Sequence, residues 1–186
     1  MTDLISFARG FLARVYEEQD FKNVDDRLRA NLKSFQSVPK EKFAAEFLAA
    51  KLALACRVWE ECCREEGLQE EETQKIFLKI VMQCFHSSET VTIAEAFSEY
   101  LYATDLEGEA KFFPALIGRL FTRLGLERPK DSDAEKVSMV GELGMLAALF
   151  EGMKTFFGNE FFEVLSEHRL RGLWNPSEGD PQRGRT

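Results

Sequence analysis

The sequence predicts an all-α fold: a single-domain bundle of about seven to eight helices, with a central buried helix near residues 134–157. Runs of β-branched residues, which would indicate strands, are few, whereas residues that favour helices, such as Ala, Leu, Glu and Lys, are abundant. Apolar side chains also recur at helical spacing along most of the chain. A hydrophobic content of 45% in 186 residues is enough to bury one sizeable core.

Each helix is predicted from an apolar stripe bounded by start and stop signals. Pro39 and Pro114 suit the first turn of a helix, and Gly67 and Gly125 are typical residues just after a helix end. Capping boxes open two further helices, Thr92 with Glu95 and Ser132 with Glu135, and Asn23 and Asn159 are expected caps. The expected helices span residues 2–18, 23–35, 39–66, 70–85, 92–101, 114–124, 132–157 and 159–170.

These helices define one domain over residues 1–174. The remaining stretch, 175–186, reads NPSEGDPQRGRT and has no apolar side chain to pack against a core. We expect it to be a disordered polar tail.

Charge and composition narrow the class of protein. The formal net charge of −8 disfavours nucleic-acid binding, because phosphate contacts need a basic face. No apolar run approaches the roughly 20 residues of a membrane span. The chain begins Met1-Thr2-Asp3, without the basic start of a signal peptide, and its four cysteines form no spaced disulfide framework. We therefore expect a cytoplasmic protein that neither inserts into a membrane nor binds nucleic acid.

No catalytic or metal-binding constellation is evident, so we expect neither an enzyme nor a cofactor. A nucleophile needs a nearby base, and the chain has only two histidines and no glycine-rich phosphate loop. Cys84 and His86 are two positions apart and point to different faces of a helix. Cys56 and Cys63 share a face, but two thiols do not make a structural zinc site.

Seven glutamates crowd the turn at Gly67. They favour a solvated acidic corner that keeps the protein soluble, and the alternative is a landing site for a basic peptide. They are Glu60, Glu61, Glu65, Glu66, Glu70, Glu71 and Glu72.

The helix expected near 134–157 carries the most informative pattern. Five mostly small residues line up on one face, which would let another helix backbone approach closely; they are Val137, Gly141, Gly144, Ala148 and Gly152. The opposite face is apolar and includes Met145, Leu146, Leu149, Met153 and Phe156. Because both faces are apolar or small, we expect this helix in the middle of the bundle.

Glu142 lies among these apolar residues. A buried carboxylate must be paired, hydrogen-bonded or protonated, because burying it alone costs several kcal/mol. One interpretation is structural, with Arg119 or Arg123 of a neighbouring helix as the partner. The other is a role in shaping a peptide-binding groove.

The second half of the chain resembles the TorD/NarJ-type family of cytoplasmic chaperones, which assist molybdoenzyme maturation. The resemblance rests on LFTRLGLE (120–127), the acidic linker RPKDSDAE (128–135), ELGMLAAL (142–149) and EHRLRGLWNP (167–176). The family's Asp-His pair before the Glu-Leu helix is absent, since Val137 and Ser138 stand there, and Met145 replaces an aromatic residue.

The resemblance implies a chaperone that binds the leader peptide or immature form of a redox enzyme during cofactor insertion. The client would combine basic and apolar stretches, which suit an acidic protein with an apolar groove. By match, the peptide-binding residues would be Asp131, Asp133, Glu142 and Leu143, with Met145 beside them.

Two other classes of function stay open. A HEAT-like or other helical scaffold would bind a folded partner through a flat apolar ridge. A small-molecule or cofactor-binding helical protein would need an apolar cavity with a few polar groups, which Glu142 beside Met145 and Phe156 could supply.

Overall fold

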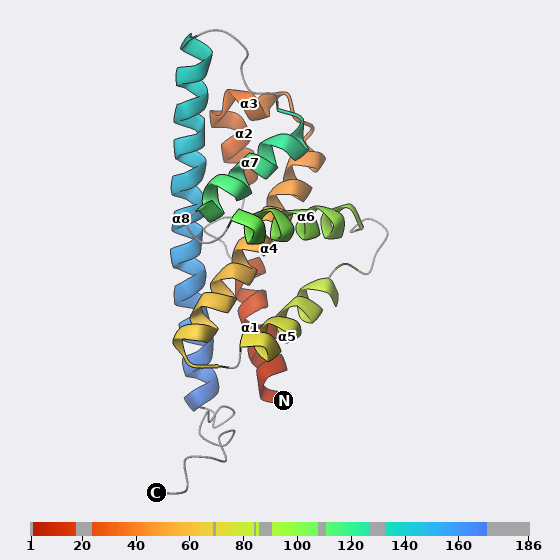
Figure 1. Ribbon diagram of the computed structural model, residues 1–186, viewed down its shortest axis with the longest axis vertical. Helices are drawn as coiled ribbons and strands as arrows, with labels where there is room; N and C mark the ends of the chain where they lie inside the picture. Colours follow the sequence, from red (N-terminus) through yellow and green to blue (C-terminus); the bar gives the residue numbers. More distant parts are fainter. Residues whose placement is uncertain are drawn as a thin grey trace, which may run out of the picture. The chain divides into compact units, whose positions relative to one another are not determined.

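The computed structural model is all-α, as the sequence predicts (Figure 1). It describes residues 2–17, 24–68, 70–83, 85, 91–107, 111–126 and 133–170, and no strand occurs among them. The helices of this part of the chain are α1 (Thr2–Glu17), α2 (Val24–Asn31), α3 (Lys33–Gln36), α4 (Lys40–Glu65), α5 (Glu70–Gln83), α6 (Val91–Glu107), α7 (Phe112–Leu124) and α8 (Asp133–Leu170). The expected tail at 175–186 lies outside the described residues.

Two helix ends match their glycine signals. Gly67 and Gly125 have φ angles of 68° and 74°, in the left-handed region that glycine adopts at little cost. Leu68 N–H donates to Cys63 O at 2.9 Å, and Leu126 N–H donates to Phe121 O at 3.0 Å. These bonds satisfy the last carbonyls of α4 and α7, so each helix ends where the sequence predicts.

Three expected boundaries are wrong. The helix expected over 92–101 continues to Glu107 as α6. The helix expected over 23–35 breaks at Leu32, whose φ and ψ of −103° and 111° are extended, and the short α3 follows. The helices expected over 132–157 and 159–170 are one helix, α8, because Gly158 and Asn159 continue it. Phe157 and Phe161 are four residues apart and fully buried, so burial along one face overrides the local stop signal.

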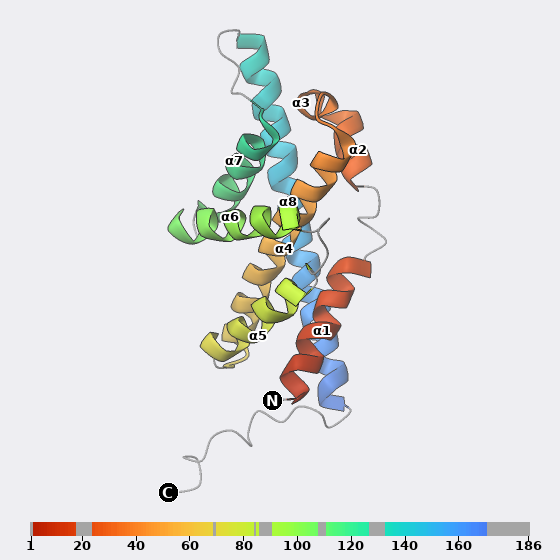
Figure 2. The same ribbon diagram turned by 90° about the vertical axis from the view of Figure 1, so that its right-hand side faces the viewer.

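The chain divides into two compact units, and α4 and α8 contribute residues to both. Unit 1 comprises Met1–Glu17, Ala55–Cys84 and Thr155–Thr186. Within it α1 packs beside α5 (Figures 1 and 2). Its core is aromatic: the Trp59 ring stacks on Phe77 with centroids 4.8 Å apart, and the Trp59 indole N–H donates to Thr73 O at 3.1 Å.

Close helix packing in unit 1 occurs at Gly10 of α1. A Cβ at this position would lie 3.0 Å from Val164 Cγ1 of α8. The ring of Phe7, one turn earlier, meets the Phe161 ring edge-on at 5.0 Å. The missing side chain of Gly10 therefore lets α1 approach α8 more closely than alanine would.

Unit 2 comprises Glu18–Leu54 and Phe85–Lys154. In it α2 packs on α3 and α6 packs on α7, and α6 runs across the direction of α8 (Figure 2). Contacting phenylalanines bridge four of its helices: Phe35 meets Phe43 at 5.0 Å and Phe121 at 5.4 Å, and Phe47 meets Phe150 at 5.8 Å.

Candidate peptide-binding site

Glu142 is buried, with 5% of its surface exposed, but its partner is not an arginine. Its Oε1 accepts a hydrogen bond from the Ser34 backbone N–H at 3.3 Å, and its Oε2 accepts one from the Ser34 hydroxyl. Ser34 lies in the first turn of α3, where backbone N–H groups have no partner within the helix. Leu32, the residue before α3, has no side-chain acceptor to cap it. The α8 carboxylate supplies that acceptor and so links α8 to the first turn of α3.

The expected pairing of Glu142 with Arg119 or Arg123 is wrong, because both arginines are engaged elsewhere in unit 2. Arg123 Nε donates to Glu46 Oε2 at 2.7 Å, and Arg123 Nη1 lies 2.8 Å from Glu99 Oε1. Arg119 pairs with the other oxygen of Glu99. The hydrogen bonds described for Glu142 are therefore those from Ser34.

Burial and charge shift the pKa values of this network. The Tyr100 hydroxyl, fully buried, donates to Glu46 Oε2 at 3.1 Å. Burial, with Glu46 beside it, raises the pKa of Tyr100. The hydrogen bond from Arg123 lowers the pKa of Glu99, and the bond to Glu46 raises the pKa of Arg123. The network therefore fixes α4, α6 and α7 through charged hydrogen bonds.

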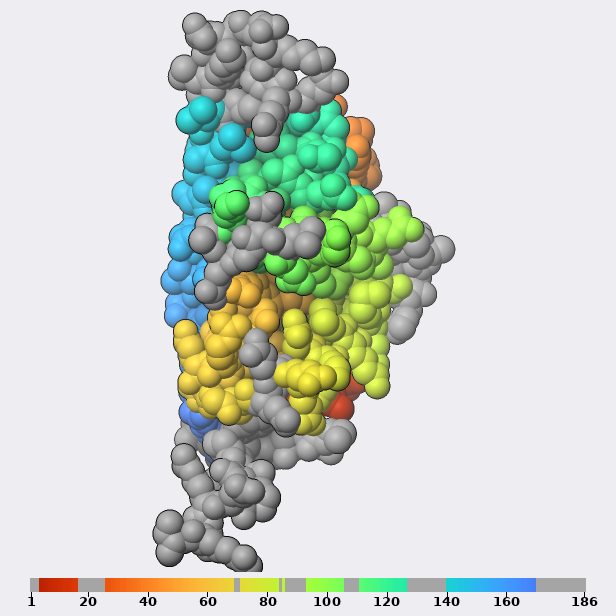
Figure 3. Space-filling view, viewed as in Figure 1, coloured from red at the N-terminus to blue at the C-terminus, as the bar shows by residue number. Residues whose placement is uncertain are grey.

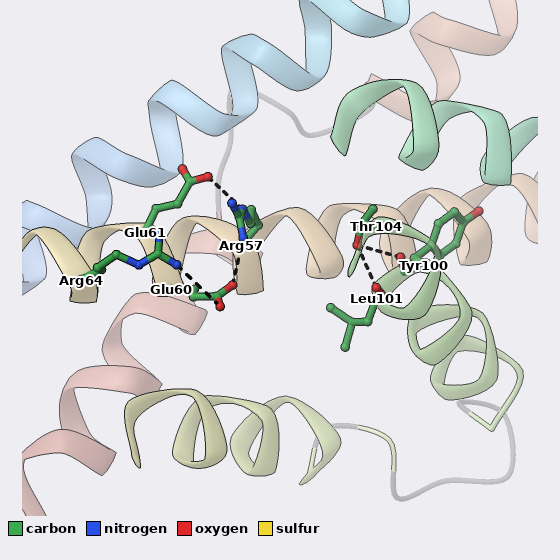
Figure 4. Close-up of polar contacts among 7 residues, drawn as sticks. All are labelled: Arg57, Glu60, Glu61, Arg64, Tyr100, Leu101 and Thr104. Atoms are coloured by element: carbon green, nitrogen blue, oxygen red, sulfur yellow. Dashed lines mark hydrogen bonds and ion pairs between the residues drawn. The ribbon is translucent and has the colours of Figure 1, made fainter. Parts of the chain in front are cut away.

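The sequence analysis missed Glu46. The pattern that drew attention to Glu142 is also present at Glu46. In both cases a carboxylate lies in a stripe of apolar residues, here between Phe43 and Phe47. Beside this network, the buried Thr104 hydroxyl bonds back to the carbonyls of Tyr100 and Leu101, both at 2.9 Å (Figure 4).

Two of the five residues on the apolar face expected as a peptide groove are fully buried, and Leu149 and Phe156 are half-buried. Leu146 and Met153 are fully buried, as are Phe150 and Phe157 on the same side of α8. Met145 differs, because half of its surface is exposed. Leu143 is half-buried. Of the expected site residues on α8 whose side chains the structure describes, Met145 is thus the one that solvent reaches most.

The small-residue face of α8 is exposed. A Cβ added at Gly141, Gly144 or Gly152 would meet no neighbouring atom within 4 Å. The expectation that these residues pack against a helix, and that the helix is buried on both faces, is therefore wrong. We call the exposed residues Val140, Gly141, Gly144, Met145, Ala148 and Gly152 the α8 face. Residues of α8 reach the molecular surface beside α6 and α7 (Figure 3).

The α8 face is unusual for a solvent-exposed helix surface. Val140 is 68% exposed and Met145 50%. Among the described side chains exposed between 140 and 152, Glu151 is the charged one, and at 100° per residue it lies in line with Val140 and Gly144. Glycine inside a helix costs about 1 kcal/mol relative to alanine, and neither packing nor a positive φ requires it at these three positions.

Asp131 lies outside the described residues. Asp133 begins α8, but its side chain is not among those described. The structure therefore does not place either carboxylate relative to Glu142 or Met145.

Four of the seven glutamates of the acidic corner at Gly67 form ion pairs with described residues. Arg57 lies between Glu60 and Glu61, at 3.3 and 2.9 Å (Figure 4). Glu66 pairs with Arg169 of α8, and Glu71 with Lys75. These contacts neutralise much of the field that a basic peptide would meet there.

Burial raises the pKa of Cys63 to about 12, so its thiol stays protonated at neutral pH. No three or more His, Cys, Asp or Glu in this part of the chain gather closely enough to hold a metal ion. Cys84 and His86 lie outside the described residues.

Comparison with protein-family models, with curated proteins and with solved structures gave no match. None of the described helices has both the length and the apolar character that crossing a membrane requires.

Proposed function

We propose that this chain binds an apolar segment of a client polypeptide along the α8 face, and that it acts as a cytoplasmic chaperone. The observation that carries the proposal is a helix surface that is exposed, nearly uncharged and lined by glycine, alanine, valine and methionine. Contiguous exposed apolar patches larger than a few hundred Å² are rare on monomeric proteins and mark interaction sites.

The α8 face suits a peptide in size and shape. From Val140 to Gly152 it extends about 18 Å along the helix axis. The glycines leave a shallow track in which a client backbone can approach closely, between Val140 on one side and Met145 on the other. Met145 can adapt to different apolar side chains, because methionine is flexible and polarisable.

The resemblance to the TorD/NarJ-type family supplies the finer proposal. The client is then the leader peptide or immature form of a redox enzyme, held during cofactor insertion. The chain's net charge of −8 would steer the basic stretch of such a client, and apolar contact with the α8 face would supply affinity. Asp131 and Asp133 precede this face in the sequence and are candidate contacts for the basic residues.

A titration with a panel of basic-plus-apolar leader peptides, at low and moderate salt, tests this proposal. We expect saturable binding of at least one peptide, weakened by salt. Gly144→Arg should reduce its affinity at least about tenfold, because the side chain fills the track and adds a like charge. Gly118→Arg is the matched control, since Gly118 is also an exposed helical glycine with an open Cβ position, on α7.

No binding across the panel would refute the chaperone, as would equal effects of the two arginine substitutions. A scaffold that binds a folded partner is the second candidate, because small residues also admit the backbone of a partner helix. It would show no leader-peptide binding, yet Gly144→Arg would weaken association with an isolated folded partner.

A further inference from the structure

We propose that the groove between α1 and α5 in unit 1 is a second docking site, for an apolar side chain of a partner polypeptide that also carries a carboxylate. The groove has a volume of about 280 Å³ and is lined by Arg9, Leu12, Ala13, Tyr16, Ile80 and Gln83. This inference does not rest on the proposed function, since the α8 face belongs to unit 2.

The groove combines an apolar floor with an exposed rim. Leu12 and Ile80 are 4% and 6% exposed, and they form the floor where α1 packs on α5. Tyr16 is 41% exposed and offers an aromatic wall, and the small, exposed Ala13 also lines the groove. An apolar side chain placed here would be partly removed from water.

Arg9 indicates the charge of the partner. It is exposed and forms no ion pair with a described residue. Every other described arginine of unit 1 is paired: Arg14 with Glu160 and Glu167, Arg57 with Glu60 and Glu61, Arg64 with Glu60, and Arg169 with Glu66. A guanidinium that makes no ion pair with a described residue, beside an apolar hollow, favours a partner carboxylate at this position.

The dimensions favour a peptide side chain. The volume lies just below the range of about 300–1,000 Å³ that is usual for small-molecule sites. From Arg9 to Tyr16 the rim extends about 10 Å, or two helical turns. A leucine or phenylalanine anchor with an Asp or Glu one turn away on a helical partner matches this spacing.

Selection from a displayed library of random peptides, about 12 residues long, tests the proposal with the full chain as bait. Binders are counter-selected on Ala13→Gln, whose larger side chain fills the groove. We expect the enriched peptides to share an apolar anchor with an acidic residue near it. A synthetic copy of one should lose affinity at least about tenfold on Arg9→Glu, because attraction becomes repulsion.

Arg27→Glu is the control for net charge, since Arg27 of α2 is also exposed and makes no ion pair with a described residue. It should bind the peptide as the wild type does, and so should Gly144→Arg of the α8 face. The proposal fails if no peptide is enriched, if the enriched peptides lack an acidic residue, or if Arg9→Glu and Arg27→Glu weaken binding equally. Failure of leader-peptide binding would leave this result untouched.

Discussion

At the residue scale, buried carboxylates hold separate elements of unit 2 together. Glu142 supplies an acceptor for α3, and Glu46 receives hydrogen bonds from both Tyr100 and Arg123. The sequence predicts that a carboxylate at position 142 must have a partner, because an isolated buried charge is costly. It cannot identify Ser34, which is 108 positions away. Only the packing of α3 against α8 brings the two residues together.

Glu142→Leu should therefore reduce the free energy of unfolding by about 1–3 kcal/mol, since it leaves two donors of Ser34 without an acceptor. Glu142→Gln keeps a carbonyl oxygen and should cost less. A double-mutant cycle with Ser34→Ala, measured by chemical denaturation, should show strong coupling between the two positions. Strict additivity would mean that this hydrogen bond contributes nothing to stability.

Glu160 in unit 1 gives a prediction for pH dependence. Burial raises the pKa of Glu160 above its ordinary value, and repulsion from Glu163 adds to the shift. Its Oε2 is buried without a hydrogen-bond donor, and Arg14 Nε lies 3.8 Å away. Because the folded state favours the protonated form, ionisation of Glu160 destabilises the protein as pH rises above 4.5.

Glu160→Gln should raise the thermal midpoint at pH 7. The gain should shrink as the pH falls towards 4 and the wild-type carboxyl becomes protonated in both states. Melting curves across this pH range check the sign. A lower midpoint at pH 7 for the variant would show that Arg14 stabilises the carboxylate more than burial penalises it.

At the element scale, helix ends with a local cause were predictable and those set by packing were not. Gly67 and Gly125 end their helices through hydrogen bonds within a few residues. Gly158 and Asn159 carry a similar local signal, yet α8 continues because Phe157 and Phe161 are both buried in it. The sequence pattern predicted a close helix contact at Gly144, but Gly144 is exposed. The close contact between helices occurs at Gly10 instead.

Gly10→Leu should destabilise the protein by about 1–3 kcal/mol or more, because its side chain would overlap Val164. Gly118→Leu is the matched control and should be neutral or stabilising, since leucine favours a helix more than glycine does. Thermal melts of both variants suffice. Equal stability of the two would mean that α1 can move away from α8 at no cost.

At the scale of the whole molecule, the all-α class followed from composition and periodicity, whereas the candidate site did not. The pattern at 140–152 indicated a helix with one small and one apolar face, and both could have been buried. The structure shows which face is core, because Leu146, Phe150 and Met153 are enclosed and Val140 and Met145 are not. A function that depends on a solvent-exposed surface can be proposed only when the buried and exposed faces of α8 are known.

Methionine methyl NMR during a leader-peptide titration tests the central claim most directly. Three described methionines lie in different environments. Met145 lies on the α8 face, Met82 is 43% exposed in unit 1, and Met153 is fully buried. We predict that the Met145 methyl signal shifts saturably while those of Met82 and Met153 stay in place. A peptide that binds without moving Met145, or that shifts Met82 equally, would contradict binding at the α8 face.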